Sequence, residues 1–216
     1  MKNIIISLAL LNAIVFAQLQ GSFIDSRDGK LYKITKIDKQ IWMAENLNYD
    51  TTGSNCYKDS ISYCDKYGRL YYWETAMKAC PSGWHLPNNK EWAALIKFAG
   101  GEKKAGAKLK AASGWNDYEY NCDSEICSGN GTDNYGFAAL PGGWKDANHS
   151  LTSPINIGKD GFWWTATKCD TTYDRPKTCP DNYYAYYWNI HYTVNYVENY
   201  TSSIFYALCS VRCLKN

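Results

Sequence analysis

The residues that could support the widest range of chemistry in this sequence of 216 residues are its nine cysteines. Thiols can form disulfides, bind metals or act as nucleophiles. Three short spacings predict local disulfides that each close a polar loop: Cys56 with Cys64, Cys122 with Cys127, and Cys169 with Cys179. A zinc site needs closely paired ligands, and the sequence has no C-x-x-C. We therefore expect disulfides and no metal, with one cysteine left over because the count is odd.

Other side chains that support catalysis do not form a recognisable set. The three histidines lie far apart: His85, His149 and His191. Carboxylates are expected to serve as helix caps, structural acceptors or solvated groups: Glu45, Glu74 and Glu91. No spacing matches a Ser-His-Asp arrangement, a carboxylate pair or a phosphate-binding loop. We expect neither an enzyme active site nor a cofactor.

The triplet Trp115-Asn116-Asp117 matches a sequence motif that forms part of a calcium and sugar site in C-type lectins. Such a site also needs a Glu-Pro-Asn or Gln-Pro-Asp loop upstream to supply oxygen ligands, and neither occurs here. The triplet is therefore interpreted as a strand-start tryptophan followed by turn residues.

Aromatic side chains make up 16% of the chain and concentrate in its second half. Consecutive residues of a strand point to opposite faces, so the runs around Tyr183 and Tyr187 cannot all lie in a core facing one side. Exposed rings suit stacking on sugars or on a protein partner. The candidate binding residues are Trp144, Trp163, Tyr184, Tyr187, Trp188 and Tyr192. The alternative is that these rings only pack a loop-rich domain.

The first residues predict export. Lys2 precedes an apolar run of 13 residues, Ile4 to Phe16, which is too short to span a bilayer. Val15 and Ala17 occupy the small-residue positions of a signal peptidase site, so we expect cleavage after Ala17. The expected organisation is a signal peptide at 1–17, a short lead at 18–24 and one domain at 25–216. No later stretch is apolar enough for a membrane helix. The expected location is the medium or the cell envelope.

Removal of residues 1–17 leaves 199 residues, enough for one domain with a sizeable core. The remaining 22 basic and 21 acidic residues give a net charge of about +1. Without a basic stripe, nucleic acid is not expected as a partner.

The elements that must position these residues are expected to be mainly helices in the first half of the chain and strands in the second half. Residues 31–43 alternate between apolar and polar around a turn at Asp38-Lys39, which predicts a hairpin. Helices are expected at 71–79, 89–99 and 103–112, the second capped by Asn88 with Glu91 three residues on. A final strand is expected over 203–214, with Phe205, Cys209, Val211 and Cys213 on one buried face. This order predicts an α+β domain.

Seven motifs stand in one order along nearly the whole expected mature chain. They are DSRDGKLY (25–32), QIWMAENL (40–47), YGRLY (67–71), CPSGWHLP with Glu91-Trp92 (80–92), YGF with LPGG (135–143), FWWT (162–165) and SVRC (210–213). In this order the chain resembles the Fibrobacter succinogenes major paralogous domain. The 80–92 block and SVRC are also similar to the formylglycine-generating group, whose fold is a variant of the C-type lectin fold.

The resemblance implies early helices packed on an irregular twisted antiparallel sheet with long loops and the chain ends brought together. In C-type lectin-like folds a helix cysteine pairs with one on the last strand, which nominates Cys80 with Cys213 and leaves Cys209 unpaired. Because Cys209 is out of step with the reactive thiol of the formylglycine-generating group, we expect it to be buried and inert.

The leading hypothesis is an exported, non-catalytic module that binds a polysaccharide or an envelope protein through aromatic-rich loops. One alternative is a diverged oxidase of the formylglycine-generating type using Cys209. Another is a purely structural envelope protein without a ligand.

Overall fold

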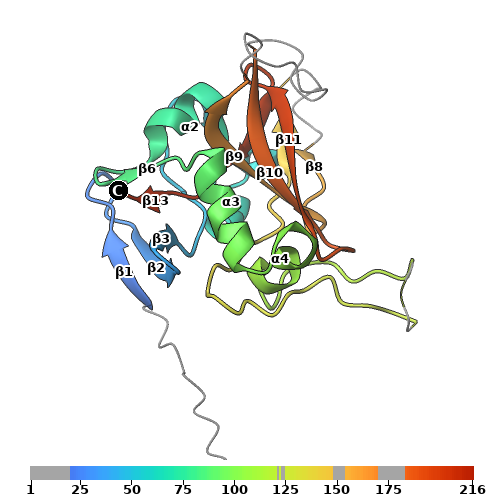
Figure 1. Ribbon diagram of the computed structural model, residues 1–216. Coiled ribbons are helices and arrows are strands. Elements are labelled where there is room, and N and C mark those ends of the chain that lie inside the picture. Colours follow the sequence, from blue (N-terminus) through green and yellow to red (C-terminus); the bar gives the residue numbers. More distant parts are fainter. Residues whose placement is uncertain (1–19, 121, 123–124, 148–153, 170–182) are drawn as a thin grey trace, which may run out of the picture.

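The computed structural model describes residues 20–120, 122, 125–147, 154–169 and 183–216. Within these ranges the chain forms an α+β fold, as expected, with two sheets and four α-helices (Figure 1). His149 and Cys179 lie outside the described residues, as does the expected signal peptide.

The smaller sheet joins the two ends of the described chain. Its strand order is β1-β2-β3-β13-β6. The bounds are β1 (Gln20–Ile24), β2 (Leu31–Ile37), β3 (Gln40–Met43), β6 (Trp84–His85) and β13 (Leu214–Lys215). The expected hairpin is present as β2 and β3, and Asp38 takes a positive φ of 53° at the turn. Because β13 pairs with both β3 and β6, the C-terminal strand is held inside this sheet.

The larger sheet has the order β11-β10-β9-β12-β5-β4, with β7 and β8 attached beside β12. Its bounds are β4 (Ser54–Asn55), β5 (Leu70–Tyr72), β7 (Trp144–Asp146), β8 (Pro154–Ile155), β9 (Asp160–Lys168), β10 (Tyr184–His191), β11 (Val197–Ser203) and β12 (Ala207–Ser210). All of these pairs are antiparallel except β9 with β12. The long strands β9, β10 and β11 form the broad orange and red ribbon of Figure 1.

The helices are α1 (Ile61–Tyr67), α2 (Trp73–Ala79), α3 (Asn89–Phe98) and α4 (Glu102–Leu109), with a 3₁₀ turn at Tyr57–Asp59. The expected cap of α3 is confirmed, since the Asn88 side chain accepts from the N–H groups of Lys90 and Glu91, and the Glu91 carboxylate accepts from Asn88 N. α2 begins later than expected because Tyr71 and Tyr72 extend strand β5. α4 ends at Leu109, before the expected Ala112, since Lys110 turns away to bridge with Ala139.

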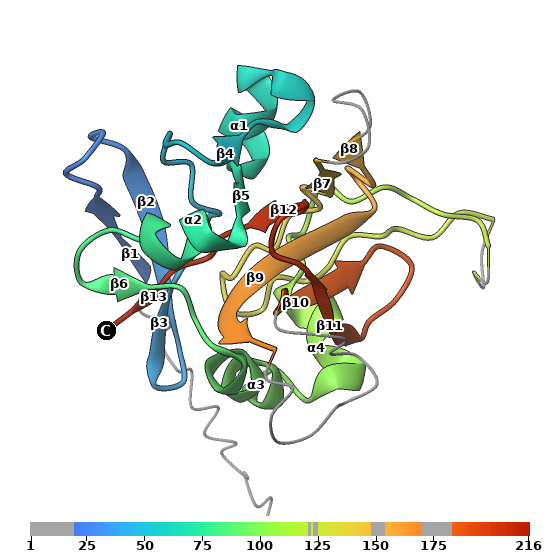
Figure 2. The ribbon, with the colours of Figure 1, turned by 90° about the horizontal axis from the view of Figure 1, so that it is seen from above.

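Helices cover both faces of the larger sheet. α3 and α4 pack against β9 and β11 on one face, and α2 packs against β9 and β12 (Figure 2). The consecutive residues Trp163 and Trp164 therefore point into two different cores, and both are fully buried. The expectation that the runs around Tyr183 and Tyr187 cannot all lie in a core is confirmed, since Tyr183 is 58% exposed while Trp188 is buried.

The final segment is divided between the two sheets instead of forming one strand. β12 belongs to the larger sheet and β13 to the smaller, and residues 211–213 cross between them. Cys209, Val211 and Cys213 are buried as expected, but so are Ser210 and Arg212, while Phe205 is 52% exposed. The expected single buried face is wrong, since a segment that passes between two sheets is enclosed on all sides.

Disulfides join Cys56 to Cys64, Cys122 to Cys127, and Cys80 to Cys213, with a Cα–Cα distance of 5.8 Å in the last. Cys169 is also disulfide-bonded, and the partner expected for it lies outside the described residues. Among the described cysteines only Cys209 is free, and it is buried. No helix in the described ranges has the length and apolar character needed to cross a membrane.

Candidate functional site

The six candidate binding rings do not form one surface. Trp163 is 0% exposed and Trp188 4% exposed, and both belong to the core under α3 and α4. Their inclusion in a binding surface is wrong, because no ligand can reach a ring enclosed between a sheet and its covering helices.

Three other candidate rings are partly buried in the larger sheet. Trp144 and Tyr187 pack against the second core, and Tyr187 lies 5.6 Å from Phe162 between ring centres. Burial raises the pKa of the Tyr187 hydroxyl. Tyr184 starts β10 opposite Ser203. These rings stabilise the sheet, and they do not line either of the two cavities described below.

Tyr192 is the candidate that reaches a cavity, and it does so at the turn between β10 and β11. The turn, residues 192–196, follows His191 at the end of β10. Tyr192 N donates to Lys159 O at 2.8 Å, and Lys159 Nζ lies 5.8 Å from the centre of the Tyr192 ring. The backbone of Tyr192 is thus held by Lys159, and the Lys159 ammonium lies over the Tyr192 ring.

The opposite wall is the described part of the 115–131 loop, residues 115–120, 122 and 125–131, which projects at the lower right of Figure 1 in yellow-green. Trp115 anchors its base, since the indole donates to Ala139 O at 2.9 Å and the ring is buried. Farther out, Tyr118 and Cys127 exchange two backbone hydrogen bonds of 2.9 and 2.8 Å. The Cys122–Cys127 disulfide closes the loop beyond this pair. A loop tied in this way can present side chains at lower entropic cost than a free one.

The two walls enclose an open groove of about 530 Å³, here called the tyrosine groove. Its lining residues are Asp117, Tyr118, Glu119, Tyr120, Ile126, His191, Tyr192 and Thr193. Tyr118 and Tyr192 meet edge to face with ring centres 5.7 Å apart. Tyr120 is 81% exposed, and Asp117 and Glu119 are exposed beside it. The groove therefore offers flat rings for stacking and carboxylates that accept hydrogen bonds.

Sequence reasoning missed the loop side of this groove. The Trp115-Asn116-Asp117 triplet, interpreted above as a tryptophan followed by turn residues, marks the start of this loop, and no group of three or more metal-ligating side chains occurs among the described residues. The informative signal was the next stretch, Asp117 to Tyr120, where acidic and aromatic residues alternate just before the Cys122–Cys127 loop. That Tyr192 faces this stretch depends on the topology of the sheet.

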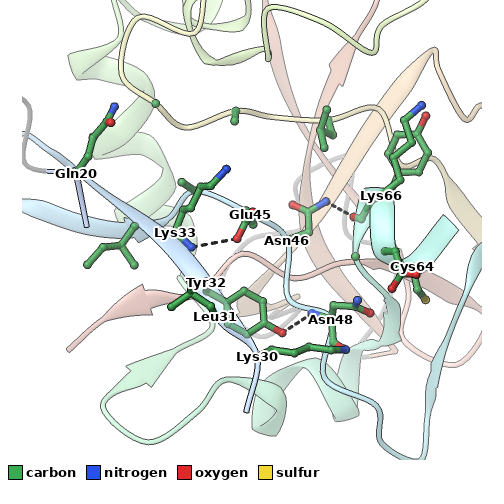
Figure 3. Close-up of a pocket in the computed structure, with 18 of the residues that line it drawn as sticks. Gln20, Lys30, Leu31, Tyr32, Lys33, Glu45, Asn46, Asn48, Cys64 and Lys66 are labelled. Carbon is green, nitrogen blue, oxygen red and sulfur yellow. Dashed lines mark hydrogen bonds between the residues drawn. The ribbon is translucent and has the colours of Figure 1, made fainter. Parts of the chain in front are cut away.

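A second cavity, of about 560 Å³, lies beside the smaller sheet and has a mixed polar and apolar lining (Figure 3). Its walls include the β2 residues, the segment 44–48, the end of α1 and the loop around Asp133. Some of the groups in Figure 3 bond within the wall: Glu45 accepts from Lys33 N at 3.0 Å, and the Tyr32 hydroxyl accepts from Asn48 N at 3.0 Å. Asn46 donates to Tyr67 O at 2.8 Å. These bonds hold the walls of the cavity together, while the buried Asn48 Oδ1 has no hydrogen-bond partner among the described residues.

Cys209 is buried, and His85, Glu45 and Glu91 make hydrogen bonds within the fold. Burial raises the pKa of the Cys209 thiol, so the thiolate needed for nucleophilic or redox chemistry is disfavoured. His85 bonds through Nδ1 to Asn216 at 2.6 Å and through Nε2 to Glu91 at 3.0 Å. The histidine thus links the side chain of Asn216 at the end of the described chain to that of Glu91 on α3. Glu45 and Glu91 act as structural acceptors, as expected.

A protein-family model described as the Fibrobacter succinogenes major domain matches residues 35–215. The chain belongs to this family. Neither the curated proteins nor the solved structures gave a match. The matched range includes both walls of the tyrosine groove, so the groove is built within the Fibrobacter succinogenes major domain and not on an appended segment.

Proposed function

We propose that this protein is an exported, non-catalytic binding module that recognises a polysaccharide through the tyrosine groove. The observation that carries the proposal is the grouping of Tyr118, Tyr120 and Tyr192 around an open groove with two exposed carboxylates. Of the six rings nominated from the sequence, Tyr192 is the one that keeps a binding role.

Sugar rings suit this arrangement for two reasons. The apolar C–H faces of a pyranose can lie on tyrosine rings, which lose little conformational entropy on binding. The hydroxyl groups at the rim of the sugar can donate to Asp117 and Glu119. An open groove, unlike a closed pocket, also admits the middle of a long chain.

The proposal also places the protein outside the cytoplasm. The disulfides of the structure fit an oxidising compartment, and the apolar run at 4–16 with Ala17 supplies the proposed signal peptide. A C-type lectin-like scaffold related to the formylglycine-generating group is part of the same proposal. It is supported by early helices, a mixed sheet and a C-terminal strand held beside the first hairpin.

The competing functions use different residues. An envelope protein partner could dock on the same rings, and a purely structural protein would use none of them. The oxidase alternative requires Cys209 to react, and its burial speaks against that.

The test measures binding of the mature protein to soluble cellohexaose, xylohexaose and mannohexaose by calorimetry, and its retention on plant cell-wall glycans and envelope preparations. Tyr120→Ala and Tyr192→Ala should each weaken glycan binding by about tenfold or more, as loss of a central aromatic contact does at other interfaces. Tyr206→Ala is the matched control, because Tyr206 is 46% exposed on the β11–β12 turn and outside the groove.

Equal losses in all three variants, or in none, would remove the tyrosine groove from the proposal. Retention on the envelope preparation alone would favour the protein partner. Absence of retention on every matrix would leave the structural alternative.

A further inference from the structure

Lys110 is a buried cation that lies between the two walls of the tyrosine groove. It follows α4 directly, is 2% exposed, and makes no ion pair among the described residues. Its Nζ donates to the carbonyl oxygens of Tyr192 at 3.2 Å and Val194 at 3.1 Å. Burying an ammonium is costly unless it is both hydrogen-bonded and paired with an opposite charge, and Lys110 has only the hydrogen bonds.

The same ammonium also contacts the other wall. Lys110 Nζ lies 5.3 Å from the centre of the Trp115 ring, which anchors the base of the projecting loop. α4 further holds the turn through Gly106, whose N–H donates to Asn195 O at 2.9 Å. The Lys110 side chain therefore contacts both walls. It bonds to the turn that carries Tyr192, and it lies over Trp115, where the loop that carries Tyr118 begins.

We propose that Lys110 is a positioning residue of the tyrosine groove, whose ammonium ties the β10–β11 turn to the 115–131 loop and so sets the spacing of Tyr192 and Tyr118. The role assigned to ligand binding rests on the proposed function. The link between the two walls does not.

The surroundings of Lys110 make its protonation a usable readout. Charged or titratable side chains on α4 and the elements around it are Glu102, Lys103, Lys104, Lys108, Asp117, Glu119, Glu125, Asp133, Lys159, Asp160, His191 and Glu198. None forms an ion pair with Lys110, and burial lowers the pKa of its ammonium to about 8. Lys110 is thus charged at pH 7 and loses its proton as pH rises through about 8. Because charge-assisted hydrogen bonds are roughly twice as strong as neutral ones, the link to the turn weakens above that pH.

The first experiment uses no ligand. NMR follows the Lys110 ε-methylene and the backbone carbonyl carbons of Tyr192 and Val194, whose oxygens accept from Nζ, between pH 6.5 and 9.5. All three should report one titration near the lysine pKa, and Lys110→Met should abolish it at both carbonyls. Lys104→Met, at an exposed position of α4, is the control and should leave it unchanged. Carbonyl shifts that stay constant while Lys110 titrates would overturn the proposal.

The second experiment adds cellohexaose. Wild-type affinity should fall severalfold above the lysine pKa, and Lys110→Met should bind about tenfold more weakly at pH 7, with no inflection in the same range and a pH 7 melting temperature close to that of the wild type. Saturation with cellohexaose should in turn raise the pKa of Lys110, because coupling between two sites is reciprocal.

The outcomes separate the two proposals. If Lys110→Met binds cellohexaose as the wild type does, the positioning role is wrong while glycan binding stands. If the wild type binds no glycan, the proposed function fails, and the ligand-free titration alone decides whether Lys110 links the walls.

Discussion

Two buried cations, Arg212 and Lys110, hold different regions of the molecule. Arg212 lies where the chain crosses between the sheets, and its guanidinium donates to Asn46 Oδ1 at 2.7 and 3.0 Å and to the Phe137 carbonyl. Its Cζ also lies 4.5 Å from the centre of the Phe137 ring. Lys110 instead reaches two carbonyls of a surface turn.

The difference follows from the shape of the two side chains. A planar guanidinium has five donors in a fixed fork and can satisfy several acceptors of a core at once, while an ammonium is a compact charge on a flexible stem. Asn46 extends the Arg212 contacts, since its Oδ1 also accepts from the Trp163 indole at 2.8 Å. We infer that Arg212 supports the whole fold and that Lys110 positions the walls of one groove. Removing Arg212 should therefore lower the free energy of unfolding more than removing Lys110.

The largest effect is expected for Arg212→Met. Loss of the guanidinium leaves the Phe137 carbonyl without this donor in a region closed to water, so the free energy of unfolding should fall by about 4 kcal/mol. Urea unfolding at pH 7 measures the change. Lys66→Met, at an exposed lysine of the cavity shown in Figure 3, should change it by less than about 0.5 kcal/mol. A loss below about 1 kcal/mol for Arg212→Met would show that the crossing does not depend on this cation.

A smaller loss is expected from opening the disulfide of the same crossing. Cys80–Cys213 spans 133 residues, for which chain entropy predicts about 5 kcal/mol, an upper figure. Cys213→Ser should lower the free energy of unfolding by about 3 kcal/mol, within the range of native disulfides in exported domains. Cys209→Ser removes only a buried free thiol and should cost about 1 kcal/mol. The reverse ranking would mean that Cys209 packing, and not the disulfide, secures the crossing.

Local sequence signals predicted the parts of this fold that depend on neighbouring residues. The capping box of Asn88 and Glu91 and the hairpin at 31–43 are examples, because the groups that interact lie within a few residues of each other. The Cys80–Cys213 pairing came from the family resemblance, since no local pattern joins such distant cysteines.

Features set by topology could not be predicted in this way. Alternation along β9 indicates that Trp163 and Trp164 face opposite sides, but not that helices cover both sides. The tyrosine groove similarly needs the 115–131 loop and the β10–β11 turn to meet, and neither segment signals the other. Lys110 appeared in the sequence only as part of an expected helix.

The last prediction concerns Lys110→Met and separates the two cations by the pH dependence of stability. The folded-state pKa of Lys110, about 8, lies below its ordinary value of 10.5. Between these values the unfolded chain binds a proton that the folded chain does not, so wild-type stability rises with pH relative to the methionine variant. At about 1.4 kcal/mol per pH unit, the wild type should gain about 2 kcal/mol over Lys110→Met between pH 7 and 9.5. At pH 7 the two should differ by less than about 1 kcal/mol, since the lost hydrogen bonds are offset by relief from burying a charge. Urea unfolding of both proteins in a Cys209→Ser background, which removes thiol exchange at high pH, measures the difference. Stability curves that stay parallel across this pH range would show that Lys110 does not titrate in the folded protein as its burial requires.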